Sequence, residues 1–168
     1  MNYINEIPID IRLFREGAQV PSHADDGSAG YDVYAWTDWK SGHAGAIRQT
    51  TTIPPHTTRV IHSGINLRIP RGWQIFILPR SGIAFKNDVT VVNSPGLIDS
   101  SFDSDFEDFE INIGLRNHSD DDFYVNHGDR IAQMVLLPAY YMKFTVVTTD
   151  NINRPIKART GGFGSTGV

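Results

Sequence analysis

Asp99 is the residue whose neighbours best suit it to activate a water molecule. It closes the segment Ser94-Pro95-Gly96-Leu97-Ile98-Asp99, directly after a tight glycine turn in an apolar stretch. A carboxylate held there can orient or deprotonate water, which is the work of a general base. The more common interpretation of a single such residue is structural, because turn aspartates often accept hydrogen bonds from nearby backbone amides.

A second segment is suited to an anion. Pro79-Arg80-Ser81-Gly82 joins an apolar run to the one stretch, about Ser81 to Lys86, that predicts a helix. The free N–H groups at a helix start and the guanidinium of Arg80 both suit phosphate oxygens. Each residue also has an ordinary interpretation, since Arg80 can form a surface ion pair and Ser81 can cap the helix.

Two polar residues interrupt apolar segments. Asp32, within Ala29-Gly30-Tyr31-Asp32-Val33-Tyr34, offers a hard oxygen ligand to a magnesium shell, or is simply a polar residue at the start of a strand. Gln133 lies in the apolar run Ile131 to Val135, where an outward-facing strand position explains it. The six histidines form no HxH or HExxH spacing, so a zinc site has little support.

The last segment combines glycine with one aromatic residue. Gly161 to Gly167 contains four glycines, two hydroxyl residues and Phe163. Glycine backbone can wrap an anion with its N–H groups, and a lone aromatic ring in such a chain suits stacking on a base. The alternative is a disordered terminus. The segment is not a P-loop, because no lysine follows the glycines.

Composition excludes several classes of protein. The chain has 168 residues, enough for one domain, and a formal net charge of -4, which is the wrong sign for binding duplex nucleic acid. The absence of cysteine excludes disulfides, thiolate metal sites and cysteine nucleophiles. Residues 1–10 lack the order of a signal peptide, and no apolar run approaches the ~20 residues of a membrane-spanning helix. We therefore expect a cytoplasmic protein.

Alternation of apolar and polar residues dominates the chain and predicts the elements that position these groups. The ranges expected to form strands are 9–13, 59–61, 65–69, 73–78, 89–92, 109–115, 131–137 and 144–147. Turn signals such as Pro54-Pro55 and His127-Gly128-Asp129 separate them. Many short strands at short spacing predict an all-β sandwich or closed barrel, with the helix near Ser81 as the only one.

Five segments, taken in order, resemble the five motifs of the homotrimeric dUTPase family, the deoxyuridine triphosphate nucleotidohydrolases. The segments are Ala29 to Asp32, Pro79 to Lys86, Asn93 to Ser100, Gly128 to Gln133 and Gly161 to Gly167. The resemblance runs from about Ile9 to Val168. It implies a distorted jelly-roll β domain over residues 1–148, an extended C-terminal arm over 149–168 that closes over the active site, and a homotrimer with three interfacial active sites.

The resemblance also implies the reaction, which is Mg²⁺-dependent hydrolysis of dUTP to dUMP and pyrophosphate. This reaction limits uracil incorporation into DNA and supplies dUMP for dTTP synthesis. Asn93 to Ile98, with Gly96 in its turn, corresponds to the uracil reader, which is too tight for the methyl group of thymine and mismatched to cytosine. Asp99 would contact the 3′-hydroxyl and activate the water that attacks the α-phosphorus.

The remaining implied roles concern the triphosphate. The positions implied to contact phosphate oxygens or to lie beside them are Arg80, Ser81, Gly82 and Gln133. Mg²⁺ would span the triphosphate and meet Asp32 through bound water. In the arm, Phe163 would stack on uracil, and the positions that would donate to the γ-phosphate are Gly164, Ser165 and Thr166.

The chain departs from the family pattern at several positions. Phe102 stands where the family usually has a tyrosine under the sugar, and Phe106 is a possible substitute for it. Arg159 is displaced by one position from the arginine that usually precedes the glycines, so its reach to the γ-phosphate is open. The loop from Trp36 to Thr52 and the acidic stretch 103–110 have no assigned role.

Two alternative functions stay open at this point. One is a dCTP deaminase, a sister enzyme of the same fold. The other is a regulatory binding protein in which nucleotide occupancy orders the arm and so controls a protein partner. The acidic stretch and the long loop motivate the second alternative, although solvated loops explain both segments more simply.

Overall fold

The computed structural model describes residues 6–37, 50–102 and 109–148, and within these ranges the chain forms β-strands and one short helix. The strands are β1 (Asp10–Leu13), β2 (Ser22–His23), β3 (Tyr31–Tyr34), β4 (Thr51–Ile53), β5 (Thr58–His62), β6 (Ile65–Arg68), β7 (Trp73–Leu78), β8 (Val89–Val91), β9 (Gly96–Asp99), β10 (Asn112–Asn117), β11 (Phe123–Val125) and β12 (Arg130–Pro138). The helix is α1 (Ser81–Asn87). The predicted all-β class is therefore confirmed.

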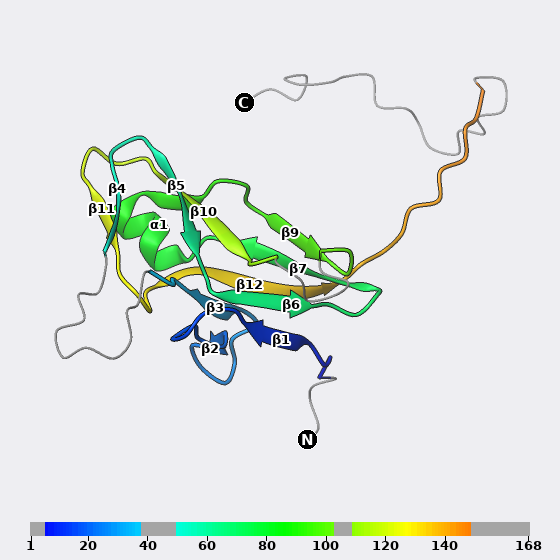
Figure 1. The fold of residues 1–168 in the computed structure, drawn as a ribbon. Helices are drawn as coiled ribbons and strands as arrows, with labels where there is room; N and C mark the ends of the chain where they lie inside the picture. Colours follow the sequence, from blue (N-terminus) through cyan, green and yellow to red (C-terminus); the bar gives the residue numbers. More distant parts are fainter. Residues whose placement is uncertain (1–5, 38–49, 103–108, 149–168) are drawn as a thin grey trace.

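The strands pair antiparallel in four small sheets (Figure 1). The largest has the order β2-β3-β12-β7-β9, and a three-stranded sheet has the order β5-β10-β8. Two pairs, β1-β6 and β11-β4, complete the jelly-roll. In the large sheet Gln133 lies opposite Asp32 on one side and opposite Leu78 on the other. This register places β3 and the end of β7 on either side of β12, with the start of α1 directly after β7.

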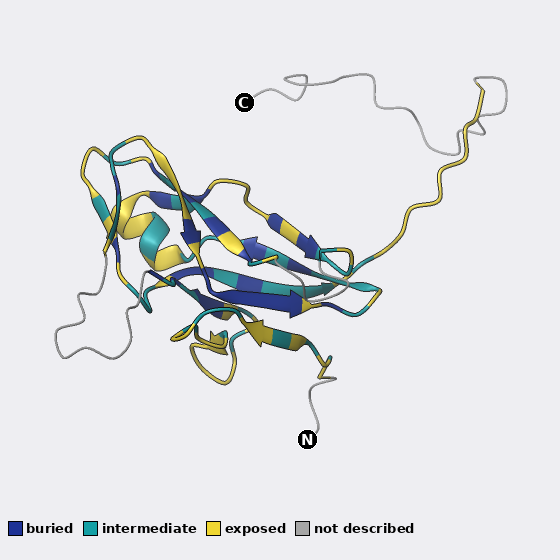
Figure 2. Cartoon of the chain, in the orientation of Figure 1, coloured by how far each residue is buried: buried dark blue, intermediate teal, exposed yellow. Residues whose placement is uncertain are grey.

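Apolar alternation explains the core. The largest fully buried side chains are Ile53, Ile65, Ile111, Ile113, Leu115 and Ile131. Burying each such side chain contributes roughly 1.5–3 kcal/mol relative to leaving it exposed. Figure 2 shows the buried residues along the strands, whereas α1 and the segment after β12 are largely exposed. The core is thus made mainly by strands, and α1 has no buried residue but packs Ile83 against it.

Some predicted elements differ from the structure. Residues 144–147 are not a strand: residues 140–148 are extended, exposed and unpaired within the described part of the chain. β10 begins at Asn112 rather than at residue 109. No strand range was predicted for β2, β4, β9 and β11, which have two to four residues each and show no alternation of apolar and polar residues. For β3, the sequence offered a strand only as one of two interpretations of Asp32.

Among the described residues, no helix has the length and apolar character needed to cross a membrane. The predicted arm of residues 149–168 lies outside the described residues.

Candidate active site

Asp32, in β3, accepts hydrogen bonds from two arginines. Its Oδ1 is 2.6 Å from Arg80 Nε, and its Oδ2 is 3.2 Å from Arg130 Nη1. Arg80 Nη1 also donates to the Arg130 carbonyl oxygen at 3.1 Å. These bonds use two of the five guanidinium protons of Arg80. The remaining protons lie on its outer nitrogens and suit an anionic oxygen.

The other residues predicted to contact phosphate lie beside this cluster. Gln133 donates from Nε2 to the Pro79 carbonyl oxygen at 2.9 Å. Ser81 and Gly82 are exposed in the first turn of α1, directly after Arg80. The structure therefore brings Asp32, Arg80, Ser81, Gly82 and Gln133 together.

A separate cavity of about 240 Å³ is lined by Asn93, Gly96 and Ile98, the predicted base-reading residues, and by Phe102, which was predicted to lie under the sugar. The Ser94–Pro95 peptide bond in this hairpin is cis. Gly96 is tightly packed, since an added Cβ would lie 3.3 Å from both Asn93 Nδ2 and Ile77 Cβ. The cavity thus combines the Asn93 side-chain amide and backbone polar groups with apolar walls, and this combination suits a flat polar ring.

Asp99 ends β9, directly after Ile98, which lines this cavity. Its Oδ1 accepts hydrogen bonds from the Ser101 hydroxyl at 2.6 Å and from the Ser101 backbone amide at 2.9 Å. These two donors stabilise the carboxylate and hold the pKa of Asp99 below its ordinary value. The turn aspartate of the structural interpretation is therefore observed. Neither bond uses Oδ2, so one oxygen stays available to water.

Within one chain Asp99 and the arginine cluster lie apart. Asp99 pairs with Gln74 near the start of β7, whereas Arg80 follows the end of β7. Six residues of extended chain span about 20 Å. Figure 1 shows α1 at one end of the molecule and the end of β9 at the other.

Glu110 makes hydrogen bonds that the sequence did not predict. We interpreted it as one carboxylate of a solvated acidic stretch, but it accepts hydrogen bonds from Arg15, from His62 Nδ1 at 3.0 Å and from the Gly64 amide at 2.7 Å. Burial opposes its ionisation, but these partners outweigh burial and lower the pKa of Glu110. Its place directly before the alternation of Ile111 and Ile113 is the signal that separates it from the acidic loop.

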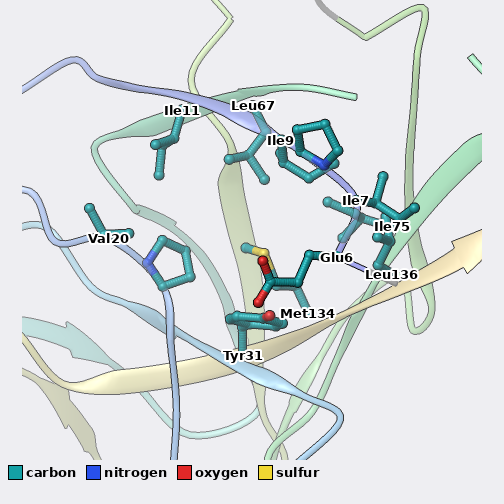
Figure 3. Close-up of a pocket in the computed structure, with 12 residues that line it drawn as sticks. Glu6, Ile7, Ile9, Ile11, Val20, Tyr31, Leu67, Ile75, Met134 and Leu136 are labelled. Carbon is teal, nitrogen blue, oxygen red and sulfur yellow. The ribbon is translucent and has the colours of Figure 1, made fainter. Parts of the chain in front are cut away.

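The cavity in Figure 3, of about 590 Å³, is not the predicted site. It lies between β1 and the large sheet, and its walls include Ile9, Ile11, Leu67 and Met134. None of the predicted site residues lines it, although Tyr31 of the first motif segment does. Its walls are mainly apolar, so it lacks the anion-binding groups of the arginine cluster.

Several predicted residues lie outside the described residues. They are Phe106, Arg159, Phe163, Gly164, Ser165 and Thr166. In the described ranges, no group of three or more His, Cys, Asp or Glu side chains could by itself hold a metal ion.

Comparison with solved structures identifies the fold as that of dUTPases. The dUTPase of Staphylococcus bacteriophage 80alpha, solved with dUpNHpp, has a TM-score of 0.74 and 20% identity, covering 96% of this chain and 99% of that one. A dUTPase variant of phage phi11 of S. aureus that coordinates a structural Mg(II) ion has a TM-score of 0.66 and 21% identity, covering 84% and 97%.

Sequence comparison then establishes the family. Residues 16–167 match the dUTPase family. The deoxyuridine 5'-triphosphate nucleotidohydrolase of Picosynechococcus is 40% identical over 151 residues, covering 90% of this chain and 92% of that protein. The same enzyme of Maricaulis maris is 35% identical over 168 residues, covering 98% and 99%. The chain belongs to the dUTPase family.

Proposed function

We propose that this protein hydrolyses dUTP to dUMP and pyrophosphate. The observation that carries the proposal is that a chain of the dUTPase family has both a tight cavity and an arginine cluster suited to phosphates. Asp99, with one free carboxylate oxygen, directly follows Ile98 of the cavity wall. Both halves consist of the residues that the motifs predicted. The product dUMP supplies dTTP synthesis, and removal of dUTP limits uracil in DNA.

In this proposal Asn93 and the backbone of β9 read uracil, and Ile98 and Phe102 form the apolar wall. The crowding around Gly96 limits the width of the cavity, which disfavours the extra methyl group of thymine. The ring of Phe102 lies under the deoxyribose and leaves no partner for a ribose 2′-hydroxyl. Phe106 remains the alternative for this place.

Asp99 is the proposed general base. Its lowered pKa keeps the carboxylate ionised at neutral pH, and Oδ2 accepts a proton from the attacking water. The water oxygen forms a bond to the α-phosphorus, while the bond from the α-phosphorus to the bridging oxygen breaks and releases pyrophosphate. Arg80, with the exposed residues Ser81 and Gly82, binds the phosphate oxygens and orients them for this attack. Gln133 lies beside Arg80 and holds the Pro79 carbonyl oxygen.

Asp32 fits Mg²⁺ that is bound mainly by the substrate phosphates and reaches the protein through water. Asp32 is a single carboxylate whose two oxygens already accept one arginine each, so it has capacity left for metal-bound water but offers no protein cage. Mg²⁺ commonly binds through one carboxylate plus substrate phosphates and keeps several waters. Bound in this way, Mg²⁺ would neutralise phosphate charge, and Asp32 would orient it through water.

We propose a homotrimer with active sites shared between copies. The carboxylate of Asp99 and the guanidinium of Arg80 lie at opposite ends of β7, too far apart in one chain for both to meet the α-phosphate. A second copy placed beside the first supplies the missing half. The exposed apolar side chains after β12, which are Tyr140, Tyr141, Met142, Phe144, Val146 and Val147, also favour contact with another copy.

The arm of residues 149–168 completes the proposal. Phe163 stacks on uracil, and the groups that bind the γ-phosphate are Arg159, Gly164, Ser165 and Thr166. Closure of this arm excludes water other than the nucleophile.

A release assay across nucleotides tests the function. Pyrophosphate should be released from dUTP with Mg²⁺ and poorly from dCTP, dTTP and UTP, and the Asp99→Asn variant should bind dUTP but be nearly inactive. Ammonia release from dCTP would instead favour the deaminase. Nucleotide binding without any release would favour a regulatory binding protein.

A further inference from the structure

Gly30 lies against the side chain of Gln133. A Cβ added at Gly30 would be 2.6 Å from Gln133 Oε1 and 3.5 Å from Gln133 Cδ. The sheet register explains this approach: Asp32 pairs with Gln133, and Gly30 is two residues before Asp32, so it faces the same side of the sheet. Only a residue without a side chain leaves the carboxamide in its place.

The space at Gly30 decides where the carboxamide of Gln133 points. Its Nε2 donates to the carbonyl oxygen of Pro79 at 2.9 Å. Gln133 and Pro79 are both half-buried. A carbonyl accepts hydrogen bonds and cannot donate, and losing its donor in such a place costs free energy. The bond therefore holds the backbone of the residue directly before Arg80.

Arg80 is thus held from two sides. Asp32 and the Arg130 carbonyl hold its guanidinium, and Gln133 holds the backbone from which it extends. Resting on the proposed function, we infer that Gly30 and Gln133 are positioning residues that set the place of the Arg80 guanidinium for the triphosphate. Gly30 acts by leaving space, and Gln133 acts by its hydrogen bond to Pro79.

The first test is a Gly30→Ala variant of the full chain, with Gly27→Ala as the matched control. An added Cβ at Gly27 meets only Asp25 Oδ1, at 3.8 Å, which is ordinary contact. Calorimetry measures binding of dUpNHpp with Mg²⁺ and binding of deoxyuridine. We expect Gly30→Ala to weaken dUpNHpp binding about tenfold through misplacement of Arg80, and to leave deoxyuridine binding unchanged. Equal weakening of both ligands would overturn the inference, because it would indicate general damage to the fold.

A double-mutant cycle separates positioning of Arg80 from a direct contact of Gln133 with phosphate. In an Arg80→Ala background, Gly30→Ala should cause no further loss of dUpNHpp affinity, because the group that it positions is gone. A further tenfold loss in that background would show that Gly30 and Gln133 act on the phosphates without Arg80, and would refute the inference.

A third measurement needs no ligand and no activity. Hydrogen exchange of the Arg80 Nε proton, followed by NMR, reports how firmly the guanidinium is held against Asp32 in the free protein. We expect faster exchange in Gly30→Ala and in Gln133→Met, which removes the donor at similar volume, and wild-type exchange in Gly27→Ala. Unchanged exchange in both variants would refute the inference even if dUTP hydrolysis holds. Absence of dUTP hydrolysis with the predicted exchange would refute the proposed function alone.

Discussion

The substitution Asp32→Asn removes the charge that holds two arginines together and keeps the shape of the side chain. The Asp32 side chain is 9% exposed, and its arginine partners are 23% exposed at Arg80 and 49% exposed at Arg130. The bond to Arg80 is short, and a bond of this charged kind contributes about 1.5–3 kcal/mol. The half-exposed Arg130 adds less than about 1 kcal/mol, because solvent screens it.

We therefore expect Asp32→Asn to lower the free energy of unfolding by about 2 kcal/mol, since an asparagine oxygen still accepts one weaker bond. With a urea dependence of about 2 kcal/mol per M, the midpoint should fall by about 1 M. The assay is urea unfolding at one fixed protein concentration, because association contributes to the stability of an oligomer.

The control for this experiment is Asp10→Asn. Asp10 is 68% exposed and lies 4.0 Å from Arg68, so its loss should change the free energy of unfolding by less than about 0.5 kcal/mol. Equal midpoints for the two variants would refute the reasoning, because they would mean that the buried carboxylate does not hold the arginines.

Three other substitutions test separate parts of the structure. Ser101→Ala removes a donor that lowers the pKa of Asp99, so the acidic limb of the pH–activity profile should move to higher pH; an unmoved limb would exclude Asp99 as the titrating base. Glu110→Gln should lower the free energy of unfolding at pH 7 by about 1–3 kcal/mol. Because folding lowers the pKa of Glu110, this difference from wild type should be fully present above the ordinary value of 4.5 and should shrink as pH falls below it, as acid-dependent unfolding will measure. Gly96→Ala should raise the KM for dUTP and destabilise the fold by about 1–3 kcal/mol through crowding, and wild-type KM and stability would contradict that packing.

The sequence predicted the fold class, which the structure confirms, and its motifs supplied the candidate residues of the proposed site. Alternation in β1, β6, β7 and β12 was long enough to identify strands, and the turn residues around α1 marked the one helix. The segment 144–147 has the composition of a strand but no partner in one chain, and composition does not reveal pairing.

Contacts between distant residues required the structure. Asp32 and Arg80 are 48 residues apart, and their pairing depends on the register of both strands with β12. Arg15 and Glu110 are 95 residues apart, so the partner of Glu110 could not be read from the sequence around it. The space at Gly30 likewise depends on which face of the sheet Gln133 occupies.

The shared active site is tested most directly by mixing two inactive variants. Asp99→Asn and Arg80→Ala are co-expressed, and pyrophosphate release from dUTP with Mg²⁺ is compared with that of each variant alone. If each site takes Asp99 from one copy and Arg80 from another, random assembly leaves about a quarter of the sites intact, and the mixture should recover about a quarter of wild-type activity. A mixture no more active than the single variants would contradict a site built from two copies.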